Sequence, residues 1–297
     1  MTAMLVDAHA HLVTDDPAYP PSPAAGTPAG DNLMTAERLL DALRGQGATA
    51  AIAVQRAHVY GYDNSYVLDS ARRYPDRLRA MCVIDAQAVD AGRTVRELAA
   101  RGAAAIRLTA PGGNRFSGTP GADWLAGAEA RRVWAAVSET GLSMCLHVYR
   151  WNRGDVLRAL PAVAREFPDV PVVLDHVAAL DVEEPPPYPE ADLLLALAEL
   201  PRVYFKVTTL NFARILAAGR DPEPLVTWLA GHFGPDRLLW GSDVTQTRGT
   251  YDDMWAIARR AVSGLPGPDA AKILGGTAAG LYGLRPAGDA SGTANSA

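Results

Sequence analysis

The chain has 297 residues, of which 48% are hydrophobic and 21% charged, a composition typical of a globular protein with a large core. Its net charge of -5 gives no basic field for binding polyanions, which argues against nucleic acid and anionic membrane surfaces as partners. The two cysteines, Cys82 and Cys145, lie in apolar runs and indicate no disulfide framework. Small molecules are therefore the expected partners.

The start of the chain lacks the pattern of a secretory signal, and no apolar run approaches the roughly 18 residues that span a membrane. These features predict a soluble cytoplasmic protein, either monomeric or a homo-oligomer.

Short apolar, β-branched runs alternate along the chain with longer amphipathic segments, which is typical of strand-helix units around a parallel sheet. The predicted strands are residues 4–10, 49–55, 77–85, 103–109, 142–149, 170–177, 202–209 and 237–244. The predicted helices are residues 35–45, 64–74, 88–101, 122–141, 153–167, 190–200, 222–233, 251–264 and 269–282, with Thr35 capping the first of them.

Eight strand-helix repeats predict an α/β fold, a single (β/α)8 TIM barrel over residues 1–285 with an extra C-terminal helix. No glycine-rich phosphate fingerprint follows the first strand, which disfavours a doubly wound nucleotide-binding fold. Residues 15–30 are rich in Pro, Gly and Ala and predict an irregular loop at the barrel mouth, either a lid or an extended surface loop. Residues 286–297 have the composition of a disordered tail.

The histidines gather where a barrel of this type places its catalytic groups, at the C-terminal ends of strands. His9 and His11 end the first predicted strand, His147 lies near the end of the fifth, and His176 ends the sixth. Side chains two residues apart on a strand point the same way, so His9 and His11 are expected to converge. Asp243 ends the eighth strand, which is next to the first once the barrel closes.

Together His9, His11, His147 and Asp243 offer three neutral nitrogen ligands and one carboxylate. This set suits zinc or another borderline divalent ion with an open position for water, which the ion would activate as a nucleophile. A single strand histidine is often only a core residue, and for His176 taken alone that interpretation is equally good.

Five segments carry a family resemblance: "VDAHAHL", "LHVY", "VLDHVAAL", "RLLWGSDV" and "ILGGTAAGLYGL". Over residues 4–284 they resemble the amidohydrolase superfamily, and within it the amidohydrolase-2 branch. That branch includes aminocarboxymuconate semialdehyde decarboxylases and lactonases that act on pyrone dicarboxylate and sugar lactones. The segment "VYGYDNSYVLDSARRYPDRLRAMCVID" looks more like the lactonases.

The resemblance implies roles for the same residues. His9, His11 and His147 would bind a divalent metal, zinc or else manganese, with Asp243 as a further ligand and proton-transferring base. His176 would polarise the substrate or act as an acid-base partner. Relatives like the pyrone dicarboxylate lactonases work without a metal and lack a histidine on the fifth strand, so His147 favours a metal if it faces the site.

Arginines suggest an anionic substrate. Arg107 ends the fourth strand and Arg115 lies in the loop that follows it, and guanidinium groups at a barrel mouth suit carboxylate recognition. For Arg115 a solvated loop charge is an equally good interpretation. Lys206 is expected either to line the mouth or to pair with a carboxylate. Further candidates for the pocket are His58, Tyr149, Arg150, Trp151, Gln246 and Arg248.

The sequence therefore predicts a metal-dependent hydrolase of a small, anionic lactone, cyclic ester or amide. One alternative is nonoxidative decarboxylation of an aromatic or muconate-type acid, and a second is a lactonase that needs no metal. A third is a barrel that binds a ligand without catalysis.

Overall fold

The computed structural model describes residues 4–23, 33–113 and 116–285. Within them, eight parallel strands follow one another in a single sheet in chain order, which confirms the predicted TIM barrel. The strands are β1 (Val6–His11), β2 (Ala50–Val54), β3 (Leu78–Val83), β4 (Ala103–Thr109), β5 (Ser143–His147), β6 (Val172–Leu174), β7 (Val203–Thr208) and β8 (Leu238–Gly241).

The barrel closes between its first and last strands. The backbone N–H of Asp243 donates to the carbonyl of His9 at 2.7 Å, and Ala10 forms a parallel bridge with Val244. The end of β8 therefore lies next to β1, as predicted.

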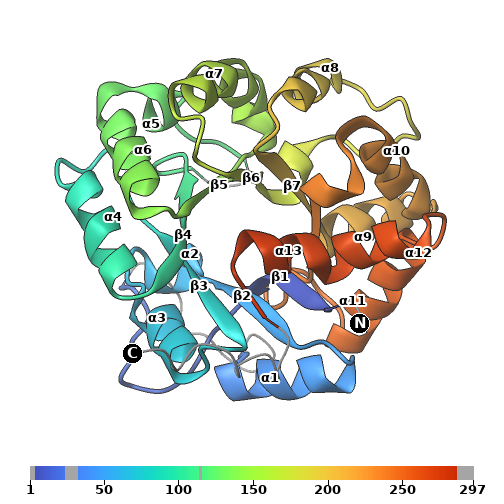
Figure 1. Ribbon diagram of the computed structural model, residues 1–297, viewed down its shortest axis with the longest axis horizontal. Helices are drawn as coiled ribbons and strands as arrows, with labels where there is room; N and C mark the ends of the chain where they lie inside the picture. Colours follow the sequence, from blue (N-terminus) through green and yellow to red (C-terminus); the bar gives the residue numbers. More distant parts are fainter. Residues whose placement is uncertain (1–3, 24–32, 114–115, 286–297) are drawn as a thin grey trace, which may run out of the picture.

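Helices surround the strands, most of them in an outer ring (Figure 1). They are α1 (Ala36–Gly45), α2 (Ala57–Tyr60), α3 (Ser65–Arg73), α4 (Ala91–Ala100), α5 (Asp123–Ala126), α6 (Ala128–Thr140), α7 (Arg153–Glu166), α8 (Asp192–Leu195), α9 (Thr209–Ala217), α10 (Glu223–Phe233), α11 (Tyr251–Ala261), α12 (Gly267–Ala271) and α13 (Thr277–Leu281). Thr35 caps α1 as expected, accepting a hydrogen bond from the N–H of Arg38.

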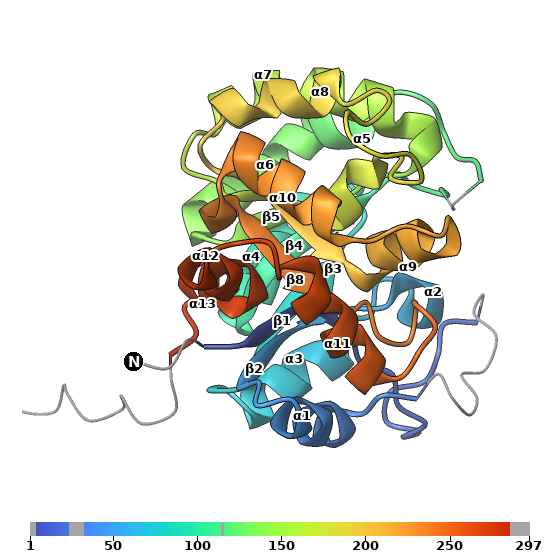
Figure 2. The ribbon, with the colours of Figure 1, turned by 90° about the vertical axis from the view of Figure 1, so that its right-hand side faces the viewer.

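The last predicted helix, residues 269–282, is divided into α12, a π-helical turn (Lys272–Gly276) and α13. The break occurs at Gly275, where any side chain would overlap the carbonyl oxygen of Met4 just before β1. Beyond it, Ala278 and Tyr282 pack into the same cluster as Val6 and Cys145 of the barrel interior. The C-terminal segment thus closes one end of the barrel, and α2 lies at the other end (Figure 2).

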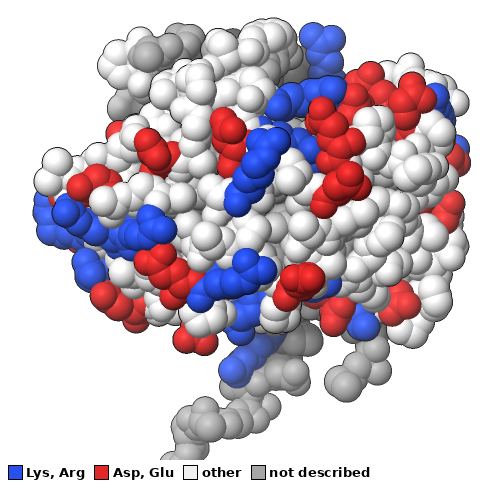
Figure 3. Space-filling view, turned by 90° about the horizontal axis from the view of Figure 1, so that it is seen from above, with Lys and Arg blue, Asp and Glu red and all other residues white. Residues whose placement is uncertain are grey.

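The predicted loop over residues 15–30 is described only as far as residue 23, and the predicted tail over residues 286–297 lies outside the described residues. Among the residues that the structure describes, no helix is both long and apolar enough to cross a membrane. Figure 3 shows acidic and basic side chains interspersed over one face of the molecule, in keeping with the many surface pairs such as Arg131–Glu166.

Candidate active site

An irregularity in β1 turns both histidines of that strand into the barrel. Val6 and Ala8 belong to the interior cluster, so strict alternation would point His9 outwards. The register with β2 shifts between Asp7 and Ala10, and the carboxylate of Asp7 accepts from the N–H of His9 at 3.0 Å. Such bulges are common next to active sites because they change the direction of a side chain.

His9, His11 and Asp243 converge on one point, as predicted. Nε2 of His9 lies 3.3 Å from Nε2 of His11, and these atoms lie 3.5 and 3.4 Å from Oδ1 of Asp243. All three residues are buried. The carbonyl of Val54 lies 2.9 Å from Nδ1 of His11 and can accept its hydrogen, which leaves Nε2 with its lone pair toward the group.

The two carboxylate oxygens of Asp243 differ in their hydrogen bonds to the described residues. Thr247 donates its hydroxyl to Oδ2 at 2.7 Å, whereas Oδ1 is buried and has no hydrogen-bond donor among the described residues. Burial opposes ionisation of Asp243, but the surrounding histidines outweigh it and keep its pKa below the ordinary value. A buried carboxylate oxygen facing two imidazole nitrogens is a chemical environment that a cation would satisfy.

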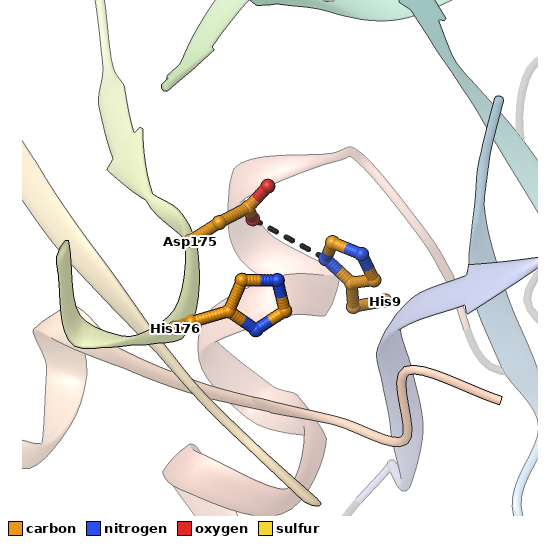
Figure 4. Close-up of side chains that lie close together, drawn as sticks. All are labelled: His9, Asp175 and His176. Carbon is orange, nitrogen blue, oxygen red and sulfur yellow. Dashed lines mark ion pairs between the residues drawn. The ribbon is translucent and has the colours of Figure 1, made fainter. Parts of the chain in front are cut away.

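A second carboxylate, Asp175, lies on the other side of His9 (Figure 4). Its Oδ1 lies 3.2 Å from Nδ1 of His9 and 3.1 Å from Nζ of Lys206, and its Oδ2 accepts from Nε of Arg107 at 2.7 Å. Although burial raises the pKa of a carboxyl group, Lys206, His9 and Arg107 lower that of Asp175 well below its usual range. Of the two expectations for Lys206, pairing with a carboxylate is the one that the structure confirms.

His176 follows β6, which is shorter than predicted and ends at Leu174. His176 begins a run of four residues, ending at Ala179, with φ between 49° and 53°, a left-handed turn that L-residues seldom adopt. Nδ1 of His176 lies 2.7 Å from the hydroxyl of Thr208, which donates its own hydrogen to Asn211. His176 therefore donates through Nδ1 and presents Nε2 as an acceptor.

His147 faces the interior but does not join the three converging side chains. Its Nδ1 lies 2.7 Å from Nη2 of Arg107, and its ring lies 5.4 Å from that of His176 and 4.6 Å from that of Tyr149. Because Arg107 can only donate, Nδ1 of His147 is the acceptor, and in the neutral ring Nε2 carries the hydrogen. Burial lowers the pKa of His147 well below its ordinary value, so the ring is neutral at pH 7.

The residues expected to contact substrate fall into different environments. Arg150 is exposed and ion-paired with Asp181 at 2.7 Å, and Arg248 is exposed beyond β8. Tyr149 is buried and stacks on Trp151. His58 is exposed on α2, and Arg115 lies outside the described residues.

Two residues at the site were missed by the sequence analysis. Asp175 precedes His176 directly, so its place in the same motif was the available signal. Arg56 follows β2 and was overlooked beside His58; the carboxylate of Asp243 partly offsets the lowering of its pKa that burial causes.

The whole of this geometry lies inside a region that matches a known family. The family model described as amidohydrolase matches residues 6–284. The chain belongs to the amidohydrolase family. The resemblance inferred from the motifs is thereby confirmed.

Two curated relatives of this amidohydrolase are lactone hydrolases by name. The L-fucono-1,5-lactonase of Burkholderia ambifaria is 33% identical over 145 residues, 45% of this chain and 49% of the relative. The matched region thus spans about half the length of that relative. The 4-sulfomuconolactone hydrolase of Rhizobium radiobacter is 25% identical over 244 residues, 80% of this chain and 74% of the relative.

Solved structures of amidohydrolase relatives share the fold. A probable 2-pyrone-4,6-dicarboxylic acid hydrolase from Acinetobacter baumannii has a TM-score of 0.72 at 21% identity, covering 94% of this chain and 99% of that one. A zinc-bound amidohydrolase from Burkholderia multivorans has a TM-score of 0.69 at 19% identity, covering 95% and 100%. A 2,6-dihydroxybenzoate decarboxylase from Rhizobium has a TM-score of 0.66 at 14% identity, covering 95% and 99%.

Proposed function

We propose that the protein is a metal-dependent hydrolase of a small anionic lactone or a related cyclic ester or amide. The observation that carries the proposal is the nearly equilateral triangle of donor atoms formed by His9, His11 and Asp243, with sides of 3.3, 3.4 and 3.5 Å. Its three side chains are among the four metal ligands that the motifs predicted, of which His147 is the fourth.

The triangle has the dimensions of a zinc site. Donor atoms bound tetrahedrally at about 2.0–2.1 Å lie about 3.3–3.4 Å apart, which agrees with the observed sides. With an ion on Nε2 of His9, the hydrogen of that ring is on Nδ1, where Asp175 can accept it as outer-shell carboxylates do.

A bound ion would polarise the substrate carbonyl and lower the pKa of a water molecule, which is the chemistry that such an ion supplies in hydrolases. Asp243 would accept a proton from the attacking water and return it to the leaving oxygen as the ring C–O bond breaks. Of the two roles considered for His176, acid-base partner is favoured, because Nε2 is an acceptor and polarising a carbonyl would require a hydrogen there.

The preference for an anion rests on the balance of buried charge. Asp175 is shared by two cations, Lys206 and Arg107, so this part of the interior carries an excess positive charge. An anionic substrate would offset that excess, since buried charges are stable only when paired. The name of one relative supports the same class, because 4-sulfomuconolactone is an anionic lactone, whereas the L-fucono-1,5-lactone named for the other is neutral.

The metal is tested by its stoichiometry in matched histidine variants. Wild-type protein purified without chelator is expected to bind zinc, His11→Ala to lose it, and His147→Ala to keep it, measured by elemental analysis after equilibrium dialysis. If His147→Ala lost zinc as completely as His11→Ala, the proposed ligand set would be wrong. If the wild type bound no zinc at all, the metal proposal would fail.

The reaction is tested by following acid release from a panel of carboxylated and neutral lactones at constant pH. The wild type is expected to hydrolyse at least one carboxylated lactone, and Asp243→Asn to lose that activity by a factor of about 1,000 or more, since the variant cannot accept the proton. Release of carbon dioxide from an aromatic or muconate-type acid would instead support the decarboxylase alternative.

A lactonase without a metal is the second candidate. One observation favours it: His147, which the family resemblance links to metal dependence, lies against Arg107 and apart from the triangle. Full lactonase activity after exhaustive chelation would select this candidate. Cytoplasmic location and a homo-oligomeric state remain predictions.

A further inference from the structure

Arg56 occupies a place above the candidate metal triangle. It follows β2 and precedes α2, and its Nη2 donates to Oε1 of Gln246, at 3.2 Å, in the turn after β8. In the barrel β1 lies between β8 and β2. A hydrogen bond that joins the segments after β2 and β8 must therefore pass over the C-terminal end of β1, where His11 lies.

This guanidinium forms no ion pair within the described part of the chain. No carboxylate there lies within ion-pair distance of Arg56, and its buried Nε–H has no hydrogen-bond acceptor. Arg107, the stronger candidate for substrate in the sequence, and Arg150, a further candidate, are instead paired with Asp175 and Asp181.

The charge of Arg56 is retained despite its surroundings. Burial lowers its pKa, and the carboxylate of Asp243 partly offsets that effect, so the two groups interact across the mouth. Arginine stays protonated at neutral pH even when partly buried. A half-buried cation with unused donors next to a reaction centre costs free energy unless a ligand supplies the anion.

We propose that Arg56 and Gln246 form the subsite for the carboxylate of the substrate, and that Arg56 thereby determines the preference for anionic lactones. This inference rests on the proposed hydrolase function. Gln246 uses its Oε1 toward Arg56, so its NH2 group can donate to the same carboxylate. An acid group held there places the remainder of a small ring over His11 and Asp243.

The test compares a lactone carboxylate with its own methyl ester, because the pair differs only in the charge that Arg56 is proposed to bind. In Arg56→Gln, kcat/KM for the carboxylate is expected to fall roughly 10- to 100-fold, mainly through KM, as expected for the loss of a charge-assisted hydrogen bond. For the methyl ester the change should stay within about threefold. Arg56→Lys keeps the charge but lacks the planar guanidinium fork, so its kcat/KM for the carboxylate should lie between the values of the wild type and Arg56→Gln.

Arg93→Gln on the outer helix α4 is the matched control, since it removes an exposed arginine whose partners are Asp90 and Glu97. This variant should hydrolyse the carboxylate and the methyl ester with the same kcat/KM as the wild type. Thermal unfolding of Arg56→Gln establishes that the variant is folded. Equal losses for carboxylate and ester in a folded Arg56→Gln would overturn the inference.

A binding measurement separates this inference from the proposed function. Glutarate, which cannot be hydrolysed, is titrated calorimetrically into zinc-loaded wild type and Arg56→Gln, and a loss of affinity of at least tenfold is expected. If the wild type hydrolysed neither lactone, the proposed function would fail, and the glutarate titration alone would then test the role of Arg56. Equal affinity in the two proteins, or no binding to either, would overturn the role of Arg56.

Discussion

Nζ of Lys206 lies 3.1 Å from Oδ1 of Asp175 inside the barrel, and neither side chain has any exposed surface. Asp175 also contacts Arg107 and His9, so one carboxylate connects a cation of β7, a cation of β4 and a histidine of the candidate metal site. The ion pair is therefore part of the framework that holds the site.

Replacing Lys206 by Met should destabilise the protein by about 1–3 kcal/mol, because Oδ1 of Asp175 loses its buried ammonium donor although Arg107 still pairs with Oδ2. Urea unfolding of the metal-free protein measures the change. Lys272→Met is the matched control: Lys272 is an exposed partner of Asp269, and its loss should change the free energy of unfolding by no more than about 0.5 kcal/mol. Similar values for the two variants would contradict a structural role for the buried pair.

Replacing Asp175 by Asn should weaken zinc binding by roughly 10- to 100-fold, because the neutral amide holds the Nδ1 hydrogen of His9 less strongly than a carboxylate. Competition with a fluorescent zinc chelator measures the affinity, and circular dichroism establishes that the variant is folded. Lys206→Met leaves the carboxylate beside His9 and should lose less affinity. A larger loss of zinc affinity in Lys206→Met than in Asp175→Asn would show that the lysine, and not the carboxylate, supports zinc binding.

Replacing Ala179 by Gly should stabilise the protein by about 0.5–1 kcal/mol, because φ is 53° at this position and glycine adopts such angles without the steric cost of a Cβ. Ala162→Gly, at an exposed position within α7, provides the comparison and should cost about 1 kcal/mol. Urea unfolding of both variants reports the difference. A destabilised Ala179→Gly would contradict the left-handed turn after β6.

The barrel was predictable because each strand is a short apolar run and most of the longer helices have a periodic pattern of their own. The convergence of His9 and His11 was predicted for an incomplete reason. Spacing of two residues puts both on one face, but the shift of register at Asp7 decides that this face is the interior.

Features that depend on distant contacts could not be read in the same way. Arg107 finds its carboxylate 68 residues away, and no local pattern signals such a pairing. The left-handed turn at His176 contains no glycine to mark it.

Helix α9 was missed although a local signal was present, since Thr208 and Asn211 form the capping box that begins it.

The rarity of lysine in this chain has a practical consequence. Lys206 and Lys272 are the two lysines of the sequence, and Lys206 is enclosed in the barrel. Lys272 begins the π-helical turn that packs against the start of β1, at the end of the barrel opposite the candidate site. Reagents that couple to lysine side chains should therefore attach the folded protein to a support by its base, with the mouth directed toward the solution.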